Sequence, residues 1–124
     1  MPLNILAVDG EPAITDLIRR ILEREPARFH VTVANSIRAA VQMLAARPAD
    51  AIVTGLWHPE LISAARNQQS PPAVCYIPAA WERDANAGDF EASALLVKPF
   101  GVAELISTID GMFPDDRVAA DRSA

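Results

Sequence analysis

The fold is decided by a stretch near the amino terminus, residues 3–12, which reads Leu-Asn-Ile-Leu-Ala-Val-Asp-Gly-Glu-Pro. Its first six residues are almost continuously apolar, a pattern typical of a strand buried on both faces of a parallel sheet. The strand stops at an acidic turn, and Pro12 suits the first turn of a following helix. An apolar stripe at helical spacing then runs from Ile14 through Leu17 to Leu22. The chain therefore opens with a strand, an acidic turn and an amphipathic helix.

The same alternation of strand and helix repeats along the chain. Four further apolar segments predict strands, at residues 29–33, 51–54, 73–77 and 94–97. Asn35 or Ser36 can cap the next helix. Helical patterns follow these strands, at residues 37–47, 60–67, 79–92 and 102–113. Five strands alternating with five helices predict an α/β fold, a doubly wound parallel sheet with helices on both faces.

Composition and charge bound the class of protein. The 124 residues are 51% apolar and 22% charged, a balance typical of a globular domain. The net charge of −5 argues against a nucleic-acid binder or a protein of anionic membrane surfaces. Cys75 is the single cysteine and is expected in the core, and neither an export signal nor a membrane span is visible. We expect a cytoplasmic domain at residues 1–113, followed by a flexible tail or the start of a linker at 114–124.

Chemistry in a doubly wound sheet is expected beyond the carboxyl ends of the strands, where such sheets bind their ligands. In this sequence those ends carry Asp9 and Glu11, the segment 54–59, Ile77, and Lys98, which is the only lysine. The turn after the first strand lacks the glycine-rich pattern of a phosphate loop. Nucleotide binding by that route is therefore not expected.

Three segments at these strand ends resemble the receiver domains of bacterial response regulators: residues 5–12, residues 50–59 and the Leu-Val-Lys-Pro-Phe motif at 96–100. The similarity covers residues 3–113 and implies a flavodoxin-like, five-stranded sheet and a role in two-component, or phosphorelay, signal transduction. In this family an aspartate after the third strand accepts a phosphoryl group, paired acids hold Mg²⁺, and a lysine neutralises the phosphoryl oxygens. A hydroxyl after the fourth strand and an aromatic ring on the fifth then switch the partner-binding face.

The resemblance places few of the residues that phosphotransfer needs in this sequence. Gly55 stands at the phosphoacceptor position, and no covalent intermediate can form on a glycine. Gly10 replaces the second acid of the metal-binding pair, which leaves Asp9 and Glu11 as a vestigial acidic pocket. We expect Mg²⁺ binding at Asp9 and Glu11 to be weak or absent, with no other cofactor. We also expect the Lys98 ammonium to pair with Asp9 in place of the metal.

The two switch positions are changed as well. Ile77 stands where the family has its hydroxyl, and Leu95 stands where it has its aromatic ring. The sequence thus resembles a pseudo-receiver that is not an enzyme and signals by protein–protein interaction. Its partner would be another protein, a linked output domain, or a second copy bound through the face of residues 80–113. Direct contacts with nucleic acid or membrane are not expected.

Two alternatives stay open. A receiver that still autophosphorylates would need a substitute acceptor such as Asp9, Glu11 or Thr54. Strand alternation points the Thr54 side chain away from the pocket if Gly55 faces it. A small-ligand sensor would instead use the emptied acidic pocket. His58, beside this pocket, is interpreted as a water-exposed loop imidazole, with pH sensing or metal binding as the alternative.

Overall fold

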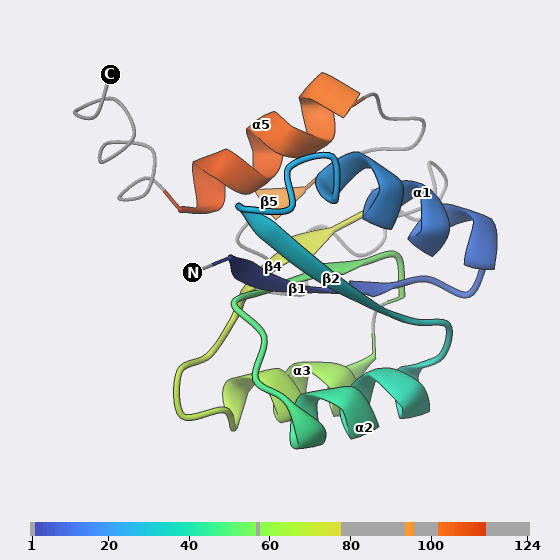
Figure 1. The fold of residues 1–124 in the computed structure, drawn as a ribbon. Helices are drawn as coiled ribbons and strands as arrows, with labels where there is room; N and C mark the ends of the chain where they lie inside the picture. The colour runs from blue at the N-terminus through green and yellow to red at the C-terminus, as the bar shows by residue number, and fades with distance from the viewer. Residues whose placement is uncertain (1, 57, 78–93, 96–101, 114–124) are drawn as a thin grey trace.

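The computed structural model describes residues 2–56, 58–77, 94–95 and 102–113. Its strands form one parallel sheet in the order β2-β1-β3-β4-β5 (Figure 1). The predicted parallel α/β sheet is confirmed, and the strand order reverses between β1 and β3. Of the predicted strand 94–97, the described part is two residues paired with β4. The strands are β1 (Leu3–Val8), β2 (Phe29–Ala34), β3 (Ala51–Thr54), β4 (Ala73–Tyr76) and β5 (Ala94–Leu95).

Helices cover both faces of this sheet. Figure 1 shows α1 and α5 on one face and α2 and α3 on the other. The helical pattern at 79–92 and the tail at 114–124 lie outside the described residues. None of the helices in the described ranges is long and apolar enough to cross a membrane. The helices are α1 (Pro12–Leu22), α2 (Ile37–Ala46), α3 (Pro59–Arg66) and α5 (Val102–Met112).

Each face of the sheet has its own hydrophobic core, because successive side chains of a strand point to opposite faces. Odd-numbered residues of β1 and β3, such as Ile5 and Val53, pack with buried residues of α1 and α5. Even-numbered residues, such as Leu6 and Ile52, pack with residues of α2 and α3. Cys75 belongs to the first core and is fully buried, as predicted. The continuous apolar runs in the sequence reflect this burial on both faces.

The helix ends follow local chemistry. Pro12 lies in the first turn of α1, where its missing N–H costs no hydrogen bond. Ser36 is the N-cap of α2, and its Oγ accepts a hydrogen bond of 3.1 Å from Ala39 N. The prediction that Leu17 lies on the buried stripe of α1 is wrong, since Leu17 is 41% exposed. Thr15 is buried instead. The inward face of α1 therefore runs through Thr15, Ile18 and Leu22, and Leu17 lies to one side of it.

Candidate functional site

The candidate site lies at the carboxyl ends of β1, β3 and β4, next to the point where the strand order reverses. Backbone hydrogen bonds continue the sheet one residue past the strands, from Gly55 N to Val8 O and from Ile77 N to Thr54 O, both 2.8 Å. Asp9, Gly55 and Ile77 therefore lie side by side on three neighbouring strand ends. The sequence-predicted positions of the acceptor, the first acid and the switch hydroxyl are thus brought together.

The Asp9 carboxylate fills the space beside Gly55. Asp9 is only 5% exposed, and its Oδ1 accepts a hydrogen bond of 2.9 Å from Glu11 N. A Cβ built on Gly55 would overlap Asp9 Oδ2 and would lie 3.1 Å from Asp9 Cγ and 3.4 Å from Ile77 O. A side chain at position 55 and the present conformation of Asp9 therefore exclude each other. Glycine is the residue that this arrangement requires.

The other described residues of the predicted acidic pocket, Gly10 and Glu11, are exposed to solvent. Glu11 is exposed and is the N-cap of α1, but its side chain makes no capping hydrogen bond. Gly10 is also exposed, and among the described residues a Cβ built there would meet only Leu56 Cδ2, at 4.0 Å. Position 10 therefore has room for a side chain, in contrast to position 55. Lys98, the predicted partner of Asp9, lies outside the described residues.

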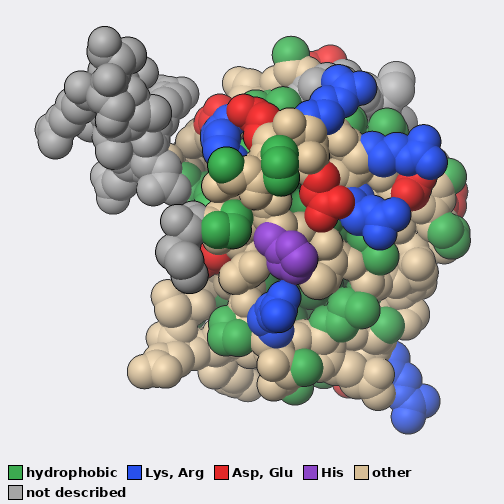
Figure 2. All heavy atoms as spheres, in the orientation of Figure 1, with side chains coloured by type: hydrophobic (Ala, Val, Ile, Leu, Met, Phe, Trp, Pro, Cys, Tyr) green, Lys and Arg blue, Asp and Glu red, His purple; other side chains and the backbone are tan. Residues whose placement is uncertain are grey.

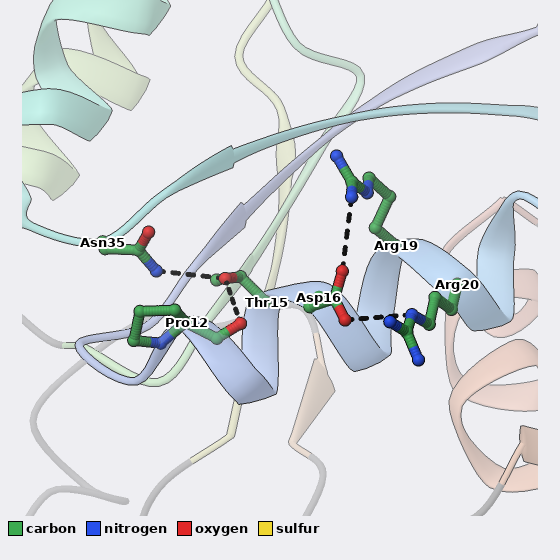
Figure 3. A network of polar contacts seen from close by, with 6 residues as sticks. All are labelled: Pro12, Thr15, Asp16, Arg19, Arg20 and Asn35. Atoms are coloured by element: carbon green, nitrogen blue, oxygen red, sulfur yellow. Dashed lines mark hydrogen bonds and ion pairs between the residues drawn. The ribbon is translucent and has the colours of Figure 1, made fainter.

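A polar network behind the pocket holds the backbone of Asp9. Asn35 Nδ2 donates to Asp9 O over 2.9 Å and to Thr15 Oγ1 over 3.0 Å. Thr15 Oγ1 in turn donates to Pro12 O over 3.1 Å, so the loops after β1 and β2 are joined (Figure 3). The sequence offered Asn35 only as an alternative cap for α2, a role that Ser36 takes. Asn35 instead positions the acidic turn.

Two polar residues at and after the end of β3, Thr54 and His58, form hydrogen bonds with the backbone two residues further along the chain. Thr54 is fully buried, and its Oγ1 donates to Leu56 O over 2.6 Å and accepts from Leu56 N over 3.0 Å. Its hydroxyl is thus engaged within its own turn. His58 is exposed and is the N-cap of α3, where its Nδ1 accepts from Glu60 N over 3.1 Å. This capping role was not visible from sequence, because histidine is not among the residues most common at N-caps.

The two predicted switch positions, Ile77 and Leu95, are both occupied by aliphatic residues. The Ile77 side chain is 1% exposed and belongs to the core under α1 and α5, beside Val53 and Cys75. Leu95 pairs with Tyr76 between β5 and β4, while its side chain lies outside what the structure describes. At position 77 an apolar side chain therefore completes the core, at the position where the resemblance to receiver domains predicts a hydroxyl.

Receiver domains hold Mg²⁺, and the described residues here fit that ion poorly. Mg²⁺ demands octahedral coordination by oxygen atoms. Gly10 and Gly55 offer no side-chain oxygen, and Asp9 Oδ1 already accepts a hydrogen bond from Glu11 N. Within the described ranges, no three His, Cys, Asp or Glu residues gather in a way that could hold a metal ion.

Comparison with known proteins places the fold. No protein-family profile and no curated protein matches the sequence. Solved structures do match, and the fold they share with this chain is that of response regulator receiver domains. A receiver protein from Sinorhizobium medicae superimposes with a TM-score of 0.72 at 26% identity, over 90% of this chain and 94% of that chain.

Two further structures show the range of proteins that contain this fold. The chemotaxis protein CheY4 of Vibrio cholerae has a TM-score of 0.75 at 22% identity, and the match covers 91% of this chain and all of CheY4. NtrX of Brucella abortus, solved in complex with ADP, has a TM-score of 0.78 at 21% identity. That match covers 99% of this chain but only 30% of the NtrX chain. In NtrX, therefore, a fold of this kind is joined to further polypeptide.

Proposed function

We propose that this chain is a degenerate receiver domain that acts in two-component signal transduction by protein–protein contact and without accepting a phosphoryl group. The observation that carries the proposal is the Asp9 carboxylate in the space beside Gly55. Gly55 has no nucleophile, and the volume where an acceptor side chain would stand is already filled. The receiver fold supports the signalling role. The domain has no catalytic residue of its own and acts in the cytoplasm.

The proposal includes weak Mg²⁺ binding or none. Mg²⁺ needs several oxygen ligands, and one buried side-chain carboxylate at these strand ends could supply only one or two of them. Only Asp9 is in that position here, because positions 10 and 55 are glycines. The Lys98 ammonium would then compensate the charge of Asp9 in place of the metal, since an uncompensated buried carboxylate is costly.

Output is proposed to be constitutive. A ligand shifts a two-state equilibrium only by its different affinity for the two states. Ile77 offers no hydroxyl to a phosphoryl group, and its side chain already completes a core. The contact face is proposed to be residues 80–113, of which helix α5 presents the exposed residues Ala103, Glu104 and Ser107. Its partner is a protein, a linked output domain as the length of NtrX suggests, or a second copy of the chain.

The test is treatment with a small phosphodonor, acetyl phosphate, in the presence of Mg²⁺. Intact-mass measurement should show no phosphoryl increment on this protein, while a receiver with its acceptor aspartate gains one under the same conditions. An increment would overturn the proposal, and peptide mapping would then assign it to Asp9, Glu11 or Thr54. In parallel, proteins captured by the immobilised domain should be the same with and without the phosphodonor. Capture that becomes several-fold stronger with the phosphodonor would contradict constitutive output.

The variant Gly55→Asp sharpens this test. It restores a carboxylate at the acceptor position but places it against Asp9, so we expect at most slow phosphorylation and no change in partner binding. Tighter partner binding by phosphodonor-treated Gly55→Asp protein would show that the coupling between the site and the contact face survives.

A further inference from the structure

A cavity of about 160 Å³ lies at the amino ends of β1 and β2, at the opposite end of the sheet from Asp9. Its floor follows from the strand register, in which Asn4 pairs with His30 and Leu6 pairs with Thr32. These four side chains lie on the face of the sheet that α2 covers. The last turn of α2 and the loop that follows it form the other wall, through Met43, Leu44, Ala46, Arg47, Pro48 and Ala49.

The cavity exists because the buried stripe of α2 ends in a charged residue. Ala40 and Leu44 are buried on this stripe, and the next position at helical spacing is Arg47. Arg47 is exposed and is the C-cap of α2. No apolar side chain therefore fills the space below Leu44. The cavity resembles in size an engineered apolar cavity of roughly 150 Å³ that binds benzene, so it has room for a six-membered ring.

The mouth of the cavity carries basic groups. Arg47 Nη1 lies 3.2 Å from His30 Nε2, and no Asp or Glu is among the described residues that line the cavity. Within the described ranges Arg47 forms no ion pair. Figure 2 shows one face of the molecule with a histidine near its centre and both basic and acidic side chains close to it. Two acids lie close to the cavity without lining it. Asp50 Oδ2 accepts a hydrogen bond of 2.7 Å from Asn4 N, and Glu23, whose Oε2 accepts from Val31 N over 3.4 Å, lines an adjoining hollow together with His30 and Arg47.

We propose that this cavity binds a small aromatic carboxylate. The ring lies between the β1–β2 floor and Leu44, and the carboxylate meets the guanidinium of Arg47 at the mouth. A guanidinium is planar and presents two parallel N–H donors to a carboxylate, a geometry that a point charge does not offer. His30 holds the Arg47 side chain over the opening by their 3.2 Å contact. This site is independent of the proposed signalling function, because it shares no residue with the Asp9 pocket.

Sodium benzoate is the probe, followed through the ¹³C-labelled methionine methyl groups by NMR. Met43 lines the cavity, so its methyl signal should shift and saturate with a Kd of about 1 mM, ordinary for a ligand of about nine heavy atoms. Met112 packs on the other core and should not shift. Benzyl alcohol is the neutral counterpart and should bind several-fold more weakly at the same ionic strength. No saturable shift of Met43 would overturn the proposal.

Two variants separate this site from nonspecific binding. Arg47→Met keeps the length of the side chain at an exposed position, and it should weaken benzoate about tenfold while leaving benzyl alcohol unchanged. Ala49→Leu fills the cavity and should abolish the Met43 shift with both compounds, with circular dichroism used to verify folding. Equal benzoate affinity in the wild type and Arg47→Met would overturn the carboxylate assignment even if Ala49→Leu did not fold.

Discussion

Asn35 donates a hydrogen bond of 3.0 Å to the hydroxyl of Thr15, and this bond joins the loop after β2 to the first turn of α1. The same Asn35 nitrogen donates to Asp9 O, and the Thr15 side chain is buried. The acidic turn is therefore fixed by side-chain amide and hydroxyl groups.

We predict that Thr15 and Asn35 are energetically coupled. Thr15→Val and Asn35→Ala should each lower the free energy of unfolding by about 1 kcal/mol, because each removes one side of the hydrogen bond. The double variant should lose about 0.5 kcal/mol less than the sum, as expected for residues in contact. Urea denaturation of the wild type, the two single variants and the double variant measures the four free energies of unfolding that this comparison needs. Gln42→Ala, at an exposed position of α2, is the control, and strictly additive losses would contradict the coupling.

Gly55→Ala should destabilise the protein by about 1–3 kcal/mol, because the new methyl group meets a buried carboxylate that is already tied to Glu11 N. The matched control is Gly111→Ala in α5, where a Cβ meets nothing within 4 Å. That variant should be neutral or gain up to about 1 kcal/mol from helix propensity. Thermal or urea denaturation distinguishes the two glycines.

Combining Gly55→Ala with Asp9→Ala should restore part of the lost stability, since the overlap disappears with the carboxylate. If Gly55→Ala alone proved neutral, Asp9 would turn aside at no cost. The space beside Gly55 would then be available to a side chain, which would contradict the proposal that Asp9 blocks it.

His58 is predicted to stabilise α3 as its cap. His58→Ala should lower the free energy of unfolding by about 1 kcal/mol, because Glu60 N loses the acceptor that His58 Nδ1 provides. His58→Asp should retain or improve stability, since aspartate is a preferred N-cap residue and its charge suits a helix amino terminus. Chemical denaturation compares the three proteins. Equal stability of the alanine and aspartate variants would show that the cap contributes nothing.

Burial raises the pKa of the Cys75 thiol from 9.0 to about 12. The unfolded thiol therefore loses its proton first, so the thiol's contribution to stability is full below pH 9 and is lost as the pH rises from 9 towards 12. Above pH 9 the stability of the wild type should fall relative to Cys75→Ala by roughly 1.4 kcal/mol per pH unit. Iodoacetamide should leave native Cys75 unmodified at pH 8 and alkylate it in urea. Rapid alkylation of the native protein would contradict this burial.

Much of the fold could be predicted from local patterns. Residues 3–8 are apolar at almost every position because both faces of β1 are covered, and the structure confirms this strand. The short helix predicted at 60–67 is α3, Pro59–Arg66. The misplacement of Leu17 arose because apolar spacing cannot show that a threonine, Thr15, is buried next to Asn35.

The geometry of the candidate site could be predicted only in part. The resemblance pointed to Asp9, Gly55 and Ile77, and the structure places them on adjacent strand ends. The Asp9 carboxylate fills the space beside Gly55, which lies 46 positions further along the chain. This contact depends on the side-chain conformation of Asp9, which no sequence pattern encodes. The cavity beside Arg47 could not be predicted from the sequence either. It depends on the position at which α2 ends over the sheet.

The Asp9 carboxylate in the space beside Gly55 also limits which mutations the protein can accept at position 55. A single mutation that introduced an aspartate there would place its side chain against Asp9 and lower the stability of the fold before any phosphorylation was gained. Position 10 differs, since in the part of the chain that the structure describes a Cβ there would have only Leu56 Cδ2 as a neighbour, at 4.0 Å. On the proposed function, an acceptor side chain at position 55 would therefore require a change at Asp9 or in its surroundings first. If the chain is a degenerate receiver, as proposed, the packing of Asp9 makes the glycine at position 55 easier to keep than to replace.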